Sequence, residues 1–340
     1  KRSGYFFYSN YQPFDNILYL GETKMNILNN MTFGIEFEAI SKVSRWELAN
    51  HYDNLIPNYD FEGEDYNHQT RDYWKVVYDD SLDTDNEFTH TTELVSPILK
   101  GESGFRDLKN ITSFIERDSM TKVNKSCGTH IHLGINQYWE ERRLTVEQKI
   151  RAMKNLFMIY TKYQDEIDSI LSPSRRSNRW AHNLIYTATQ VRTDRIDSDS
   201  ERKKVLRSFS RKLNKKHSIQ AIHEMTGTRY QVINLQNWVS RGTVEFRQHQ
   251  GTQNFEKIKH WIIFLMKLIE RATDKAIQDK KITSGIRTNG RAKFNQIFKR
   301  KMKRETYQFF LERRLDFEVN MGPADYERLY DNNDEVTENE

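Results

Sequence analysis

The chain has 340 residues, of which 36% are hydrophobic, 12% aromatic and 30% charged, and its formal net charge is +5. The aromatic content and the strongly periodic segments exclude a largely disordered chain and favour one elaborated domain with extensions. A single cysteine, Cys127, excludes an internal disulfide, and without a membrane-length apolar run or a signal-peptide pattern we expect a cytoplasmic protein.

The charge is distributed unevenly. Residues 324–340 contain seven acidic residues and one basic residue, so the rest of the chain carries +11. The positive charge is concentrated in residues 201–216 and 286–304. Such runs either contact phosphates or form solvated faces, so an anionic partner such as nucleic acid is allowed but not required.

Periodicity predicts the secondary structure. In chain order we expect a strand over 31–40, a helix over 44–56 beginning after the N-cap Ser44, strands over 74–78 and 92–96, a helix over 105–115, a strand over 128–134, a helix over 145–171, strands over 230–235 and 243–252, and a helix over 258–269. Most strands do not alternate with helices in the way parallel βαβ units require. The sequence therefore predicts an α+β fold with an antiparallel sheet.

Polar side chains occupy alternate positions of three predicted strands. Side chains two residues apart in a strand share a face, which gives the groups Glu36 and Glu38, His130 and His132, and Glu245, Arg247 and His249. Taken singly, each group also fits a solvated sheet face, satisfied structural histidines or a row of cross-strand ion pairs. Each strand in any case offers one polar face backed by an apolar one.

If these strands are neighbours, their polar faces merge into one floor. Clustered carboxylates repel one another unless cations hold them, and oxygen ligands suit Mg²⁺, with an imidazole also acceptable to Mn²⁺. An Arg on the same floor suits a phosphate oxygen. The residues therefore predict a divalent-metal phosphate site on a sheet face.

Other familiar motifs are missing from the sequence. It contains neither the glycine-rich P-loop pattern nor the dinucleotide Gly-x-Gly-x-x-Gly pattern, so a nucleotide is not expected at a helix N-terminus. Cys127 stands before Gly128 without a nucleophile signature, and we interpret it as structural.

Five motifs in order resemble the amidoligase family, whose members are similar to glutamine synthetase and glutamate–cysteine ligase in the catalytic domain. They are FGIEFE (33–38), DDSL with TELVSPILKG (79–82 and 92–101), SCGTHIHLG (126–134), SPSRRSNRWA (172–181), and RYQVINL with TVEFRQHQGT (229–235 and 243–252). The resemblance covers about 220 residues and departs from the family pattern at Asp80, where Gly is usual.

The resemblance implies a curved antiparallel sheet of the glutamine synthetase type, helices on its outer face, and ATP bound through Mg²⁺ or Mn²⁺ ions. The implied metal ligands are Glu36, Glu38, Glu93, His130 and Glu245; His132 shares the face of His130, and which of the two binds metal stays open. Arg247 would contact the transferring phosphate, and Asp79 would accept the proton of the amine. Arg175 or Arg176 would bind ATP phosphate or a substrate carboxylate, with a solvated basic loop as the alternative.

The implied function is an ATP-dependent carboxylate–amine ligase that forms an amide through an acyl phosphate, with ADP and phosphate as products. Its carboxylate and amine substrates are a small molecule, a peptide or a modified macromolecule, and no membrane partner is expected. The implied domains are an N-terminal extension (1–30), a catalytic domain (31–280) with a basic insert at about 195–225, and a basic segment with an acidic tail (281–340). The alternatives are an ATP-dependent phosphotransferase and a nucleic-acid- or protein-binding module on the same scaffold.

Overall fold

A computed structural model describes residues 30–176, 178–192, 196, 198–285, 293–299 and 302–317. Within these residues, nine strands form one sheet, with a main path in the order β2-β3-β4-β1-β7-β9-β8, and β5 and β6 pair with β1 outside that path. Every pairing is antiparallel except that of β2 with β3. The predicted α+β fold with an antiparallel sheet is confirmed.

The strands are β1 (Thr32–Ser41), β2 (Phe61–Gly63), β3 (Trp74–Val77), β4 (His90–Val95), β5 (Leu99–Lys100), β6 (Thr121–Lys122), β7 (Gly128–Leu133), β8 (Ile233–Asn234) and β9 (Val244–Gln250). β1 is central, since it pairs with β4 on one side and with β7 on the other. Segments about 210 residues apart in the sequence therefore meet on one sheet face.

The helices are α2 (Arg45–Leu55), α3 (Gly101–Ile115), α4 (Ile135–Glu141), α5 (Val146–Lys162), α6 (Gln164–Asp168), α7 (Pro173–Arg176), α8 (Leu184–Thr189), α9 (Asp199–Asn214), α10 (Ile219–Thr226), α11 (Trp238–Arg241), α12 (Phe255–Ile277), the π-helical turn η2 (Asn295–Lys299) and α14 (Arg304–Asp316). Ser44 caps α2 in a capping box, as predicted. None of the described helices is long and apolar enough to span a membrane.

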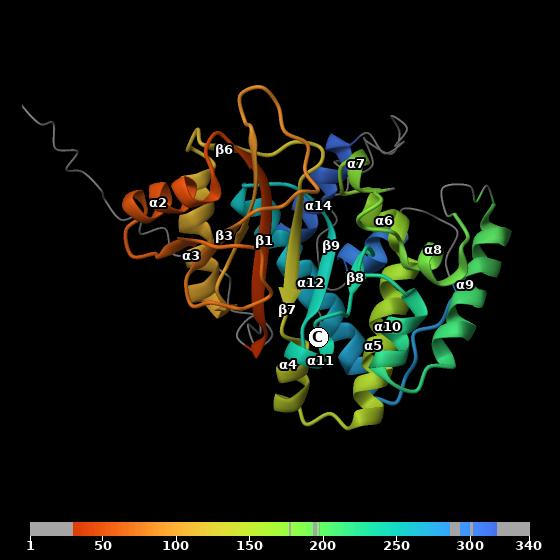
Figure 1. Cartoon of the computed structure of the whole chain (residues 1–340). Helices are drawn as coiled ribbons and strands as arrows, with labels where there is room; N and C mark the ends of the chain where they lie inside the picture. Colours follow the sequence, from red (N-terminus) through yellow and green to blue (C-terminus); the bar gives the residue numbers. More distant parts are fainter. Residues whose placement is uncertain are drawn as a thin grey trace, which may run out of the picture.

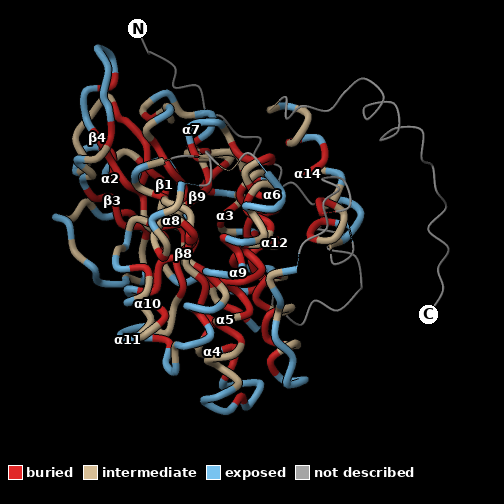
Figure 2. Tube along the Cα trace, turned by 90° about the vertical axis from the view of Figure 1, so that its right-hand side faces the viewer, coloured by how far each residue is buried: buried red, intermediate tan, exposed pale blue. Residues whose placement is uncertain are grey.

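The core lies between the sheet and its helices. The apolar residues of β1 face this layer, and the ring of Phe33 lies 4.9 Å from that of Phe105 on α3. The long helices α5 and α12 pack against each other, and Figure 1 shows α12 behind β7 and β9. Figure 2 shows the buried residues gathered in the sheet and the inner sides of the helices. The opposite face of the sheet is left for polar side chains.

The predicted helix over 145–171 is wrong as a single element. The helix stops at Tyr163, whose backbone leaves the helical region (φ −111°, ψ 20°), and resumes as α6. The tyrosine hydroxyl donates a hydrogen bond of 2.8 Å to Gln296, which ties the break to η2. The break turns Gln164 and Asp168 towards β9.

The predicted strand over 230–235 is much shorter, because only Ile233 and Asn234 pair with β9. Gln231 instead forms an isolated bridge with His182. The basic segment 201–216 folds mostly as α9, which turns Leu206 and Phe209 inwards and leaves most of its cations at the surface. The acidic tail 324–340 and residues 1–29 of the predicted extension lie outside the described residues.

Strand β9 contains a bulge. Ile131 of β7 pairs with Phe246 and Thr129 pairs with His249, so β9 has one extra residue between these pairs. The bulge reverses the side of the sheet to which the rest of β9 points, and the His249 ring lies 5.4 Å from that of Trp261 on α12. The prediction that His249 shares a face with Glu245 and Arg247 is therefore wrong.

Candidate functional site

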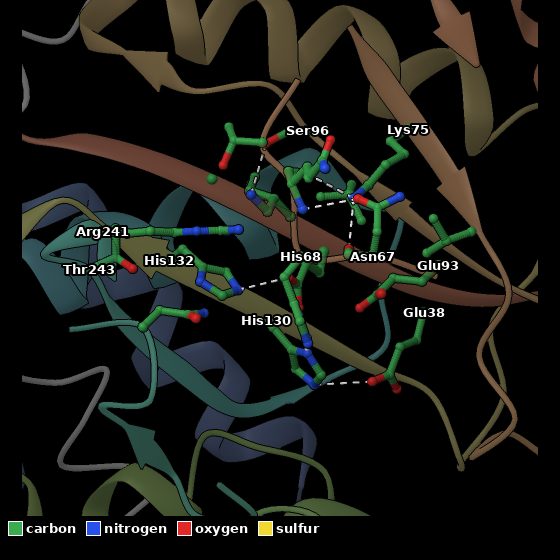
Figure 3. Close-up of a pocket in the computed structure, with 18 of the residues that line it drawn as sticks. Glu38, Asn67, His68, Lys75, Glu93, Ser96, His130, His132, Arg241 and Thr243 are labelled. Carbon is green, nitrogen blue, oxygen red and sulfur yellow. Dashed lines mark hydrogen bonds and ion pairs between the residues drawn. The ribbon is translucent and has the colours of Figure 1, made fainter. Parts of the chain in front are cut away.

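A cavity of about 630 Å³ opens on the polar face of the sheet. Figure 3 shows its side chains, with Glu38, Glu93, His130 and His132 turned towards one another from neighbouring strands. The strands β1, β4, β7 and β9 form the floor, and their register places Glu36 opposite His130 and Glu38 opposite Glu93. The merged polar floor expected from the alternation is present.

Glu36 lies at the centre of this floor. Its carboxylate oxygens lie 3.2 Å from Nδ1 of His130 and 3.0 Å from Nε2 of His132. Burial acts to raise the pKa of Glu36, but the two imidazoles outweigh it and hold the pKa well below its usual range. Both histidines therefore lie within hydrogen-bonding distance of the same carboxylate.

Glu93 has the opposite electrostatic environment. Burial raises its pKa well above the usual range, and the neighbouring charges of Glu36, Glu38 and Asp79 raise it further. Glu38 has a pKa of about 2, because His130 and Arg175 outweigh the effect of burial. Without a cation, the protonated form is therefore favoured more for Glu93 than for Glu36 or Glu38.

Glu245 and Arg247 form an ion pair at the β9 side of the floor. Asn234 of β8 donates a hydrogen bond of 2.7 Å to the same carboxylate. Burial acts to raise the pKa of Glu245, and the charge of Arg247 overcomes it and lowers the pKa. Glu245 is consequently an ionised carboxylate with two fixed partners.

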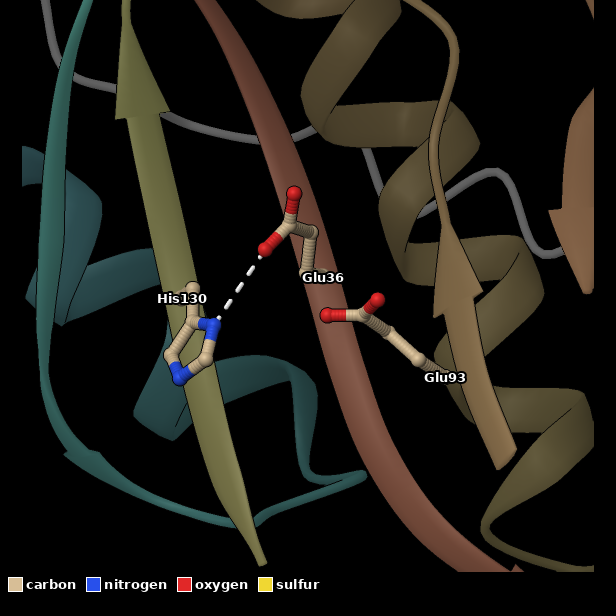
Figure 4. A group of neighbouring side chains, drawn as sticks. All are labelled: Glu36, Glu93 and His130. Atoms are coloured by element: carbon tan, nitrogen blue, oxygen red, sulfur yellow. Dashed lines mark hydrogen bonds and ion pairs between the residues drawn. The ribbon is translucent and has the colours of Figure 1, made fainter. Parts of the chain in front are cut away.

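Three overlapping groups of ligand atoms are close enough to hold a divalent ion. In each group one atom per residue lies within 4.8 Å of the others, and the groups are Glu36, Glu93 and His130; Glu36, His132 and Glu245; and Glu38, Asp79 and Glu93. Figure 4 shows the first group, with Glu36 between His130 and Glu93. Carboxylate oxygens with an imidazole match the donor preferences of Mg²⁺ and Mn²⁺, and the shared residues place the groups side by side.

The two predicted arginines of α7 differ in position. Arg175 lines the cavity but is only 1% exposed, and its guanidinium donates to the backbone carbonyl of Arg247 at 2.7 Å. Arg176 donates to the carbonyl of Leu171 and is not among the residues that line the cavity. The geometry therefore brings only Arg175 to the site.

Asp79 and Asp80 both line the cavity, close to Ser81. The backbone amide of Ser81 donates a hydrogen bond of 2.8 Å to the Asp79 carboxylate. Burial raises the pKa of Asp79, and the nearby charge of Glu38 adds to that effect. Asp79 thus lies beside Glu38 and Glu93 at one end of the floor.

Several lining residues were missed by the sequence analysis. Lys75 of β3 is 4% exposed and donates to the carbonyls of Asn67 and Gln69, both at 3.1 Å. It thereby holds the loop before β3 against the cavity. Arg241, at the end of α11, points into the opposite end of the cavity beside Thr243 (Figure 3). The alternation of Trp74–Val77 places Lys75 on the floor side, whereas no sequence signal marks Arg241.

Cys127 is fully buried in a small apolar cluster with Ile40, Leu82 and Phe88. Burial raises the pKa of its thiol to about 11, so the thiol stays protonated at neutral pH. This environment agrees with the structural interpretation of the residue.

Comparison with known proteins gives one family. The sequence pattern of a family described as "Putative amidoligase enzyme" matches residues 29–269. Comparison with curated proteins finds no match. Among solved structures, a bifunctional glutathione synthetase from Pasteurella multocida is similar over 86% of this chain, with 12% identity and a TM-score of 0.39. The chain spans 48% of the length of that synthetase.

Proposed function

This chain belongs to the amidoligase family, and on that premise we propose that it joins a carboxylate to an amine through an acyl phosphate, with ADP and phosphate as products. The family assignment makes the chain a ligase enzyme, so the binding-module alternative is not retained. The observation that supports the chemistry best is the floor of buried carboxylates and imidazoles with Arg247 at its edge. A carboxylate is a poor acyl donor until phosphorylation supplies a leaving group.

The floor suits divalent ions, which we propose to be Mg²⁺ or Mn²⁺. The residues that would hold them are Glu36, Glu38, Glu93, Glu245 and the two histidines, with His130 shared between more carboxylates than His132. Burial and the neighbouring carboxylates raise the pKa of Glu93, which supports a bound cation at this end of the floor. Bound ions would neutralise the charge on the phosphate oxygens of ATP.

Arg247 is proposed to bind the phosphoryl group during transfer. Its guanidinium is anchored by Glu245, and the charge of that carboxylate outweighs burial and raises the pKa of Arg247, so it stays a fixed positive charge. A substrate carboxylate oxygen would bond to the γ-phosphorus while the bond to the ADP oxygen breaks. Arg175 would add positive charge beside the phosphates, and Arg176 has no place in this proposal.

In the second half-reaction, the amine nitrogen would attack the acyl carbon and phosphate would leave. The nitrogen must then lose a proton, and Asp79 is the proposed acceptor. Its position at the edge of the floor, with a raised pKa, supports this role. The sheet would be of the glutamine synthetase catalytic type, with residues 31–280 as the catalytic domain.

The proposal is tested by analysing nucleotide products. Purified protein is incubated with Mg²⁺ and ATP, with and without the small-molecule fraction of a cell extract, and ADP is resolved from AMP. We expect extract-stimulated ADP that is absent in Glu245→Gln and retained in Glu62→Gln, an exposed glutamate of β2 that does not line the cavity. Formation of AMP instead of ADP would refute the acyl-phosphate route.

A further inference from the structure

Arg247 is one of the two residues of the β9 bulge. Phe246 and His249 both face the helices, and Arg247 between them faces the floor. A shift of one residue in a strand moves every side chain to the other face. The position of Arg247 therefore depends on whatever fixes the bulge at residues 247 and 248.

The backbone of the bulge is held by Arg175. Its guanidinium donates to the carbonyl of Arg247 at 2.7 Å and to the carbonyl of Gln248 at 3.4 Å. Arg175 is 1% exposed, so these hydrogen bonds are made away from water. A buried guanidinium with two backbone acceptors fixes a peptide segment more firmly than a neutral donor would.

The side chain of Gln248 is held from the helix layer. Its Oε1 accepts hydrogen bonds from the hydroxyl of Tyr160 at 2.9 Å and from Nε2 of Gln164 at 3.1 Å. Its Nε2 donates to Oδ1 of Asp168, and Gln164 donates to the same oxygen at 2.7 Å. Gln164, Gln248 and Asp168 thus form a closed ring of hydrogen bonds around the bulge residue.

We propose that Arg175, Gln248 and Asp168 are positioning residues that lock the β9 bulge and so aim Arg247 at the terminal phosphate of ATP. This inference rests on the proposed function, because it assumes that Arg247 binds that phosphate. The ring exists only because the helix breaks at Tyr163, which brings Gln164 and Asp168 to β9. Removing one member takes a hydrogen bond from each of the two buried side chains that remain, and the bulge loses its fixed register.

The test compares nucleotide affinities and needs no acid or amine substrate. The dissociation constants of ADP and of AMP-PNP, a non-hydrolysable ATP analogue, are measured by calorimetry in Mg²⁺. The dissociation constant of ADP divided by that of AMP-PNP reports the contribution of the terminal phosphate to binding. We expect Gln248→Met to lower this ratio about tenfold, the size of one lost charge-assisted hydrogen bond. Arg247→Ala should lower it equally, and the double variant should show no further loss.

Matched variants separate positioning from general destabilisation. Asn155→Leu removes three hydrogen bonds that join α5 to α12 and to the segment after it, none of which involves Arg175, Gln248 or Asp168, and should leave the ratio unchanged. Asp168→Asn keeps the accepting oxygen and should preserve the ratio, whereas Asp168→Leu should lower it. If Gln248→Met fails to fold, the two Asp168 variants still test the positioning role.

The outcomes distinguish the two proposals. If Arg247→Ala loses the preference for the terminal phosphate but Gln248→Met and Asp168→Leu keep it, the positioning role is overturned while the function stands. If wild-type protein binds neither nucleotide, or Arg247→Ala keeps the preference, the proposed role of Arg247 fails and the inference falls with it.

Discussion

Glu38 of β1 and Glu93 of β4 lie directly opposite each other on neighbouring strands. Like charges in this relationship destabilise a sheet, and here both side chains are buried. Burial and the charges of Glu36 and Glu38 raise the pKa of Glu93 well above its usual range, which favours a proton on that carboxyl. When no cation is bound, ionisation of Glu93 therefore costs stability.

Glu93→Gln should remove the stability cost of ionising this residue. Since the folded-state pKa of Glu93 is raised, its cost appears as pH rises above the value in the unfolded chain. We expect the metal-free variant to be more stable than wild type at pH 8, by on the order of 1 kcal/mol, with little difference at pH 5. Mg²⁺ should raise the Tm of wild type more than that of the variant, which keeps on the floor only the group of Glu36, His132 and Glu245. Thermal unfolding with EDTA or Mg²⁺ measures both effects, and equal metal responses would contradict the assignment.

Metal affinity should rise with pH. His130 has a pKa of about 9, since Glu38 and Glu36 outweigh the effects of burial and of Arg247, and burial raises the pKa of Glu93 well above its usual range. Both must lose protons to become ligands, so binding releases protons. Calorimetry with Mn²⁺ in buffers of different ionisation enthalpy should give different apparent heats. Heats independent of the buffer would show that these groups do not bind the ion.

Asp168→Asn should stabilise the protein selectively at high pH. Desolvation raises the pKa of Asp168 to about 7, above its usual value, and the donors Gln164 and Gln248 only partly offset this. The carboxylate therefore costs stability as pH rises towards that value, and the cost is full above it. The Tm difference between variant and wild type should grow from pH 5 to pH 8. A constant difference would mean that Asp168 titrates normally.

Gly128→Ala should damage the site more than the fold. A Cβ there would lie 2.9 Å from the guanidinium of Arg175, 3.1 Å from Nε2 of His130 and 3.2 Å from Glu38. These atoms belong to side chains and not to the backbone, so they must move aside, and we expect Mn²⁺ affinity to fall about tenfold with a smaller effect on Tm. Gly34→Ala is the control, because its Cβ meets nothing nearer than 3.8 Å. Equal losses of affinity in both variants would contradict the prediction.

The floor could be predicted because period two is a local property of the chain. Alternation in FGIEFE and GTHIHL correctly placed their carboxylates and imidazoles on one face. The position of His249 could not be predicted, since a bulge depends on Arg175 and Asp168, which lie far from β9 in the sequence. The break at Tyr163 was equally hidden, because its apolar neighbours keep helical spacing across it.

The order in which the strands are synthesised gives the central position of β1 a further consequence. β1 is made early but stays without its full set of neighbours until β7 has been made, and the floor is incomplete until β9 emerges near residue 250. A nascent chain that stops short of β9 lacks both Glu245 and Arg247. Because the group of Glu36, His132 and Glu245 is complete only when β9 has been made, an ion bound by that group would stabilise the completed chain and not the shorter ones.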